Sequence, residues 1–186
     1  MIREVLKRRP DFEYSISATT RPKRGHEVDG KDYYFLTREE FKKRIEAGDF
    51  VEWAEVHGHL YGTPKSALQA QLAAGKVVLL DIDVDGGLQI RKLFPDRSLL
   101  IFLLPPSMEV LTERLKGRST ESDEQIKRRL ERIPKEISRA AKYDVIVVND
   151  DFNETVEKVI SLIEFNLELL STEDKEKSKN AANGGL

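Results

Sequence analysis

Apolar and polar positions alternate in blocks along most of this chain. Nearly continuous apolar runs, typical of strands buried on both faces of a parallel sheet, occur at residues 77–82, 99–104 and 145–148. Apolar residues recur at helical spacing in four segments, at residues 65–74, 107–116, 123–141 and 153–170. This pattern, with a further strand expected at 12–17, predicts an α/β protein whose parallel sheet core is flanked by helices.

Residues 21–63 have a different pattern, richer in aromatic, glycine and charged residues, with short alternating strands at 33–36 and 50–56. The pattern predicts an inserted small antiparallel subdomain. Charged residues 1–10 look like the end of an amphipathic helix stopped by Pro10. The expected organisation is therefore a core at 1–20, the subdomain at 21–75, the core again at 76–170, and a disordered tail at 171–186.

Composition narrows the class of protein. The 186 residues are 39% hydrophobic and 34% charged, the balance of a globular protein. Lys and Arg number 31 against 33 Asp and Glu, so the net charge of −2 argues against a general nucleic-acid binder but allows a local basic pocket. Cysteine is absent, which excludes disulfides and suits a cytoplasmic protein. No run of 18 apolar residues is present, so we expect no membrane span.

A basic loop follows the strand expected at 12–17. Ser17 is followed by further hydroxyl residues, and Arg21 and Arg24 then flank Pro22. Guanidinium groups bind phosphate oxygens in a two-pronged manner, so the loop is a candidate phosphate site. Taken alone, however, such a segment is more often a solvated basic turn than a phosphate site.

A carboxylate and two tyrosines form a second candidate cluster. Glu52 lies on an expected strand, and a carboxylate can accept hydrogen bonds from the N1–H and exocyclic amine of guanine, a donor pair that adenine lacks. Tyr33 and Tyr61 could hold a phosphate through their hydroxyls. The alternative for these aromatic residues is ordinary packing.

Acidic residues alternate at the end of the strand expected at 77–82. Asp81 and Asp83 would lie beyond the carboxyl end of that strand, where open α/β sheets bind ligands and a carboxylate can hold Mg²⁺ or its waters. The alternative for a strand-final aspartate is a helix cap.

Arginines surround a polar loop between two expected helices. Arg114, Arg118 and Arg129 could neutralise a transferring phosphoryl group from a mobile lid. The alternative is solubilising charge on a helix face.

Taken together, in order and spacing from about residue 10 to about residue 165, these segments resemble guanylate kinase. The resemblance rests on six short stretches, at residues 15–24, 29–35, 50–63, 80–84, 105–107 and 148–150. It implies a P-loop kinase-like fold with an inserted GMP-binding subdomain and a lid at about 117–132. It also implies transfer of the γ-phosphoryl of ATP to GMP with Mg²⁺, in purine nucleotide metabolism, by a monomer or homodimer.

The resemblance also implies a role for each matching residue. Guanine would be contacted by Ser17, Glu52, Thr63 and Asp83. The GMP phosphate would be held by Arg21, Arg24, Tyr33 and Tyr61. The catalytic group would comprise Arg21, Arg118, Arg129 and Asp81, and the ATP side would comprise Arg114, Arg118 and Asn149. Asp81 and Asp83 would hold the metal through water.

Two features depart from the family pattern. The 186 residues contain no Gly-x-x-x-x-Gly-Lys-Ser/Thr sequence, the Walker A loop that cradles ATP phosphates. We expect that the chain starts just after this loop and its strand, through a mis-assigned start or a fragment, and therefore binds GMP, turns over ATP poorly and loses stability. Pro134 interrupts the helix expected near the lid.

Two alternatives remain beside the kinase. A guanylate-kinase-like binding module without ATP chemistry would also lack the Walker A loop. Another nucleoside monophosphate kinase, such as an adenylate kinase, is disfavoured by Glu52 and by the Tyr-Gly-Thr segment at 61–63.

Overall fold

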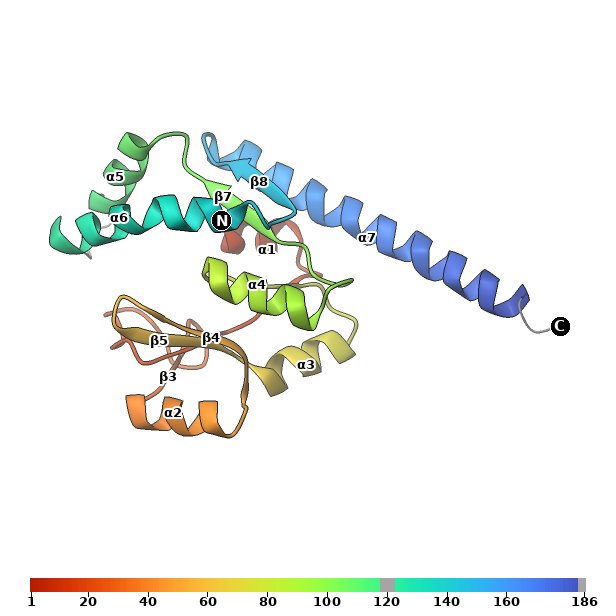
Figure 1. Cartoon of the computed structure of the whole chain (residues 1–186), viewed down its shortest axis with the longest axis horizontal. Coiled ribbons are helices and arrows are strands. Elements are labelled where there is room, and N and C mark those ends of the chain that lie inside the picture. The colour runs from red at the N-terminus through yellow and green to blue at the C-terminus, as the bar shows by residue number, and fades with distance from the viewer. Residues whose placement is uncertain (118–122, 184–186) are drawn as a thin grey trace. The chain divides into compact units, whose positions relative to one another are not determined.

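The structure of the protein is a computed structural model that describes residues 1–117 and 123–183 and falls into two compact units, Met1–Pro95 and Asp96–Leu186 (Figure 1). The first unit contains, in chain order, α1 (Ile2–Arg8), β1 (Glu13–Tyr14), β2 (Ala18–Thr19), β3 (Tyr34–Phe35), α2 (Arg38–Glu46), β4 (Phe50–Val56), β5 (His59–Pro64), α3 (Lys65–Ala73), β6 (Val78–Leu79) and α4 (Val84–Leu93). The second contains β7 (Ile101–Leu104), α5 (Met108–Lys116), α6 (Asp123–Ala140), β8 (Val145–Val148) and α7 (Phe152–Asn183).

A four-stranded sheet in the order β3-β2-β5-β4 forms the inserted part of the first unit. β4 and β5 form an antiparallel hairpin that turns at His57 and Gly58, both with positive φ, and β2 pairs with β5 in the antiparallel sense. β3 instead lies parallel to β2. The long loop at 20–33 carries the chain from the end of β2 back to the level of its start, so both strands run in the same direction. The predicted antiparallel pairing is therefore present, with one parallel neighbour.

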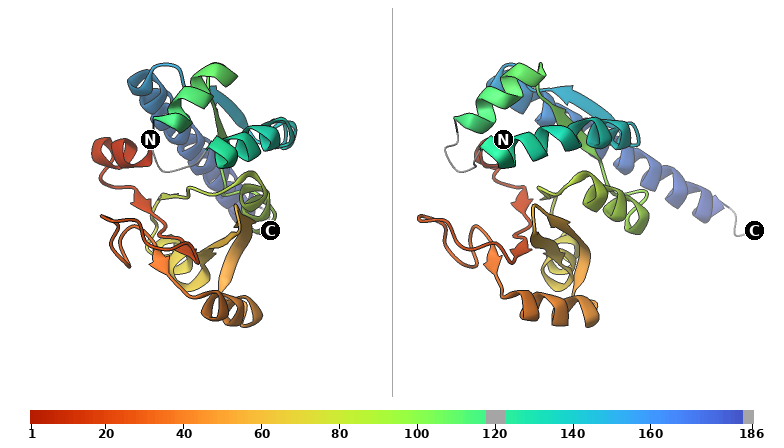
Figure 2. Two further views of the ribbon diagram at one scale, coloured as in Figure 1. Left: turned by 90° about the vertical axis from the view of Figure 1, so that its left-hand side faces the viewer. Right: turned by 60° about the vertical axis from the view of Figure 1, so that its left-hand side comes forward.

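Helix α2 packs beside this sheet and was not predicted from the sequence. It begins with a capping box in which Thr37 and Glu40 each bond the other's backbone N–H. Its Phe41 is fully buried, stacks on Phe50 with ring centroids 4.4 Å apart, and joins a small apolar core with Ala18 and Leu60. Both views of Figure 2 show the ribbon of α2 lying below the strands of this sheet. This core fixes the hairpin that carries the candidate guanine-binding residues.

A short parallel ladder joins β1 to β6, with Glu13 opposite Val78 and Tyr14 opposite Leu79. The strand expected at 77–82 is thus confirmed only at residues 78–79. The chain then enters α4, a helix that the sequence analysis missed, after Asp83 at its N-cap. The Oδ1 of Asp83 accepts a hydrogen bond from the Gly86 N–H at 2.8 Å.

The second unit is built on the parallel pair β7 and β8, whose register runs from Ile101 opposite Val145 to Leu104 opposite Val148. Both strands lie where the apolar runs predicted them. Burial on both faces is not observed for β8, because Ile146 and Val148 remain 46% and 50% exposed in this two-stranded ladder.

The helices of the second unit confirm three predicted segments and correct two details. Helix α6 runs unbroken through Pro134, so this residue does not end the helix. Helix α7 continues to Asn183, beyond the start of the tail expected to be disordered from residue 171, because Glu, Lys and Ala in that stretch favour helix. The lid expected at about 117–132 includes residues 118–122, which lie outside the described residues.

None of the helices within residues 1–117 and 123–183 is both long and apolar enough to cross a membrane.

Candidate functional site

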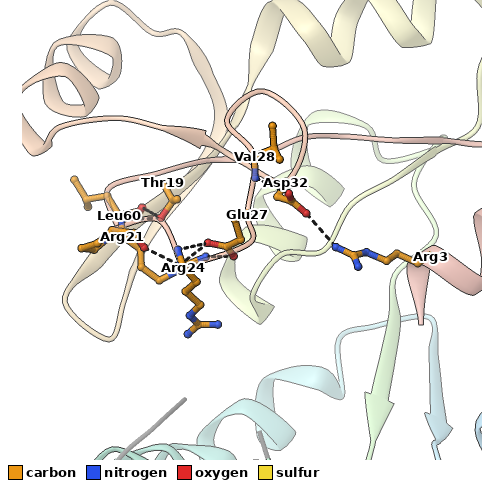
Figure 3. A network of polar contacts seen from close by, with 9 residues as sticks. Arg3, Thr19, Arg21, Arg24, Glu27, Val28, Asp32 and Leu60 are labelled. Carbon is orange, nitrogen blue, oxygen red and sulfur yellow. Dashed lines mark hydrogen bonds and ion pairs between the residues drawn. The ribbon is translucent and has the colours of Figure 1, made fainter. Parts of the chain in front are cut away.

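The basic loop that follows β2 is anchored to β5 by a buried hydroxyl. Thr19 is fully buried, and its Oγ1 donates to the Leu60 carbonyl at 3.0 Å while accepting from the Arg21 N–H at 3.1 Å (Figure 3). The backbone at Arg21 is therefore tied to the neighbouring strand. Arg21 leaves the sheet from a defined position.

Glu27 holds the Arg21 side chain inside this loop. The two side chains form a two-pronged ion pair with N···O distances of 3.0 and 2.7 Å, and they are only 10% and 11% exposed (Figure 3). Glu27 also accepts from the Arg24 backbone N–H at 2.8 Å. Arg21 lowers the pKa of Glu27, and Glu27 in turn raises the pKa of Arg21. The loop is thus folded around one carboxylate, while the Arg24 residue itself is exposed.

Aromatic rings form the floor beneath Arg21. The Arg21 Cζ lies 5.3 Å from the ring centroid of Tyr33, and the rings of Tyr33 and Tyr61 meet edge to face with centroids 6.1 Å apart. Burial, followed by the negative charge of Asp81, raises the pKa of the Tyr33 hydroxyl. Three of the four residues predicted to hold phosphate therefore lie together.

The candidate guanine-binding carboxylate is buried on β4. Glu52 is 4% exposed, lies opposite Thr63 in the β4–β5 ladder, and accepts a hydrogen bond from the Thr63 Oγ1 at 2.6 Å. Burial raises the pKa of Glu52, and the charge of Asp83 raises it further, whereas the bond from Thr63 lowers it. Ser17 is also buried, and its carbonyl accepts from the Tyr34 N–H at 2.9 Å. The hairpin thus presents a carboxylate with one fixed oxygen.

The two aspartates after β6 have different surroundings. Asp81 is exposed, whereas Asp83 caps α4 through one carboxylate oxygen. The helix-cap alternative therefore holds for Asp83. The part of the chain that the structure describes contains no cluster of three or more His, Asp or Glu side chains arranged to hold a metal directly. A role of Asp81 and Asp83 toward metal-bound water stays a prediction.

The predicted ATP-side residues lie in the second unit. The Arg114 guanidinium donates to the Asn149 carbonyl at 2.9 Å and to the Asp150 carbonyl at 3.3 Å. Asn149 is held by its own N–H, which donates to the Leu104 carbonyl at 2.7 Å. Arg129 is partly exposed on α6, and Arg118 lies outside the described residues. Arg114 and the backbone at 149–150, which follows β8, are thus linked by hydrogen bonds.

Three residues of this region escaped the sequence analysis. Glu27 binds the Arg21 side chain and a backbone N–H of its own loop, and Thr19 binds the Leu60 carbonyl of β5. No periodic pattern along the sequence marks such contacts. Gly86 faces Glu52 only because α4 packs on β4. A glycine in the first turn after Asp83 was the available clue, since glycine is disfavoured inside helices.

Comparison with known proteins gives one consistent family. The guanylate kinase family model matches residues 1–166. The guanylate kinase of Thermotoga maritima is 47% identical over 163 residues, which cover 88% of this chain and 78% of that protein. The guanylate kinase of Synechocystis is also 47% identical, over 88% of this chain and 85% of its own.

A solved structure agrees with these relatives. The crystal structure of guanylate kinase from Anaplasma phagocytophilum superposes with a TM-score of 0.75 at 34% identity, over 88% of this chain and 78% of that one. The α/β fold is therefore confirmed. On the family match and these identities, the chain belongs to the guanylate kinase family.

Proposed function

We propose that the protein transfers the γ-phosphoryl group of ATP to GMP, giving ADP and GDP, as a step of purine nucleotide metabolism. The observation that carries the proposal is the buried Glu52, fixed by Thr63 in the same unit as the cluster of Arg21, Tyr33 and Tyr61. The relatives named guanylate kinase support the same activity.

Guanine recognition would rest on the β4 carboxylate. Its two oxygens can accept from the N1–H and the exocyclic amine of guanine, whereas adenine would place an acceptor and no matching donor pair there. Thr63 occupies one lone pair of Oε1 and leaves the remaining acceptor sites of Glu52 for the base. Ser17 and Asp83 would complete the guanine contacts. A site built this way rejects bases that leave its buried carboxylate unpaired.

Phosphate binding would use the loop and its aromatic floor. Arg21 offers five N–H donors, of which the ion pair with Glu27 engages only some, so the others can reach phosphate oxygens. Arg24, Tyr33 and Tyr61 would supply the further donors. Because phosphoryl transfer depends mainly on positioning and charge neutralisation, these contacts would also place the attacking GMP oxygen.

The donor side would be completed by Mg²⁺ and by arginines of the second unit. Mg²⁺ bound with ATP would neutralise charge on the transferring phosphoryl group. Asp81 and Asp83 fit this ion as hard oxygen donors, because Mg²⁺ keeps several waters that one or two carboxylates can hold. Arg114, Arg118 and Arg129 would stabilise the developing charge, with Asn149 near adenine. The cysteine-free composition supports a cytoplasmic location, and we expect a monomer or homodimer.

A second candidate is a binding module that retains the acceptor site without phosphoryl transfer. The family match and the relatives named guanylate kinase favour the kinase over this module. The two candidates share GMP binding and differ in turnover.

Two measurements on the whole chain test both candidates. Calorimetric titration should show binding of GMP and far weaker binding of AMP. A coupled assay with ATP and Mg²⁺ should then detect ADP formation that depends on GMP. Absence of GMP binding would overturn the site assignment. Selective GMP binding with no GMP-dependent ADP formation would favour the binding module.

A further inference from the structure

Gly86 lies in the first turn of α4 and is buried against β4. Its N–H is held by Asp83, the N-cap residue. Glycine within a helix is less favourable than alanine, because its backbone loses more conformational freedom on folding. Its occurrence at this buried turn therefore needs a local reason.

The reason is a close approach between the turn and the Glu52 carboxylate. A Cβ added to Gly86 would lie 2.7 Å from the Glu52 Oε2 and 3.3 Å from its Cδ, and also 3.2 Å from the Asp83 Oδ1. The first distance is well below van der Waals contact. Any side chain at 86 would therefore have to displace Glu52.

Glu52 has little freedom to move away. Its Oε1 accepts from the Thr63 hydroxyl at 2.6 Å, and the whole side chain is buried between β5 and α4. The neighbouring Asp83 is equally fixed, because its Oδ1 caps the helix. Displacement of Glu52 would break its bond from Thr63 or turn the plane of its carboxylate.

We infer that Gly86 is a positioning residue for guanine recognition, whose missing side chain lets the Glu52 carboxylate lie against α4 with its plane fixed by Thr63. This inference rests on the proposed contact of Glu52 with guanine. The N1–H and the exocyclic amine of guanine are parallel donors, and both can bond the carboxylate only when its plane is fixed. Hypoxanthine lacks the exocyclic amine, so its single N1–H donor depends less on the orientation of that plane. Gly86 thereby contributes to the preference for guanine without touching the base.

The test is Gly86→Ala in the whole chain, titrated with GMP and with inosine monophosphate. GMP affinity should fall roughly tenfold or more, the effect of losing one hydrogen bond to a charged group, with a smaller fall for inosine monophosphate. Lys92→Ala is the control on the same helix, because Lys92 is exposed in the last turn of α4. It should keep the wild-type affinities and their ratio.

A double variant separates positioning from general damage to the fold. Glu52→Asp shortens the side chain by one methylene and so relieves the clash with an alanine at 86. The losses of GMP affinity and of melting temperature caused by E52D should therefore be smaller in G86A than in the wild type. A simple sum of the two effects, or wild-type GMP affinity and selectivity in G86A, would overturn the inference. Glu52→Gln identifies which proposal has failed: if it leaves GMP binding unchanged, the guanine site itself is misassigned.

Discussion

The two units hold their predicted site residues in different ways. In the first unit, Glu52 and Arg21 are nearly buried and paired with Thr63 and Glu27. In the second, the predicted ATP-side Arg114 is exposed and donates hydrogen bonds to two backbone carbonyls. Buried partners fix a side chain before its ligand arrives, whereas an exposed arginine keeps much of its freedom. The predicted acceptor side is therefore pre-organised, whereas the predicted donor side carries its charge on an exposed side chain.

The largest effect is expected from Glu52→Gln, which removes the carboxylate proposed to bind guanine. The amide presents N–H groups where guanine also presents donors, so GMP affinity should fall on the order of 100-fold or more, with selectivity over AMP lost. Calorimetry measures both. Glu55→Gln is the matched control on the same strand, because Glu55 is exposed. A loss below threefold in E52Q would show that the carboxylate does not bind the base.

Arg21→Met should have the next largest effect on GMP affinity, and a comparison with Arg114→Met tests whether the first unit alone binds GMP. Losing a two-pronged contact to phosphate should weaken GMP roughly 10-fold to 100-fold and leave guanosine binding unchanged. Lys23→Met controls for charge in the same exposed loop, and Arg114→Met applies the same change in the second unit. Both should leave GMP affinity at the wild-type value. An equal loss in R114M would contradict the contrast.

Glu27→Gln should lower GMP affinity less, because it only loosens the hold on the Arg21 guanidinium. It keeps the shape of the side chain but weakens the ion pair, so GMP affinity should fall about 3-fold to 10-fold and the melting temperature should drop modestly. Because the pKa of Glu27 is lowered in the fold, its charge stabilises the protein above the unfolded pKa, and this advantage is lost as pH falls through the folded pKa. The difference in melting temperature between wild type and E27Q should therefore shrink in acid. A constant difference would indicate packing instead.

The smallest expected effect is the pH dependence of guanosine binding. The pKa of Glu52 is raised above its usual 4.5, and guanine donors need the ionised form. Guanosine affinity should thus be constant at high pH and weaken as pH falls through a value above 4.5. The sign for stability is opposite: burial of Glu52 is tolerated best at low pH, so the wild type should lose stability relative to E52Q as pH rises. Guanosine avoids titration of the phosphate, and a pH-independent affinity would argue that Glu52 does not contact the base.

The sequence predicted the regular elements better than the loops. Apolar runs and helical spacing located β7, β8, α5 and α6, because those patterns follow from burial alone. Helix α2 was missed inside an aromatic and charged stretch, although Thr37 and Glu40 already formed a capping-box sequence. Helix α4 was missed because Asp83 was interpreted through metal chemistry rather than as a cap.

The candidate site was predicted by residue type and not by geometry. The motifs indicated Arg21, Glu52 and their neighbours, but partners such as Glu27 depend on how a loop folds back on itself. Gly86 depends on the distance between a helix turn and a strand, which no pattern along the chain contains. Close approach is a property of tertiary structure, and the spacing of residues along the chain does not encode it.

The proposed GMP site lies within residues 1–95. Hydrogen–deuterium exchange of the whole chain with and without GMP, in the absence of ATP, tests it most directly. We predict slower exchange in the loop at 20–33, in the β4–β5 hairpin and in the first turn of α4, with little change in the amides around Arg114. Unchanged exchange in these segments at saturating GMP, or slower exchange confined to the second unit, would contradict the account.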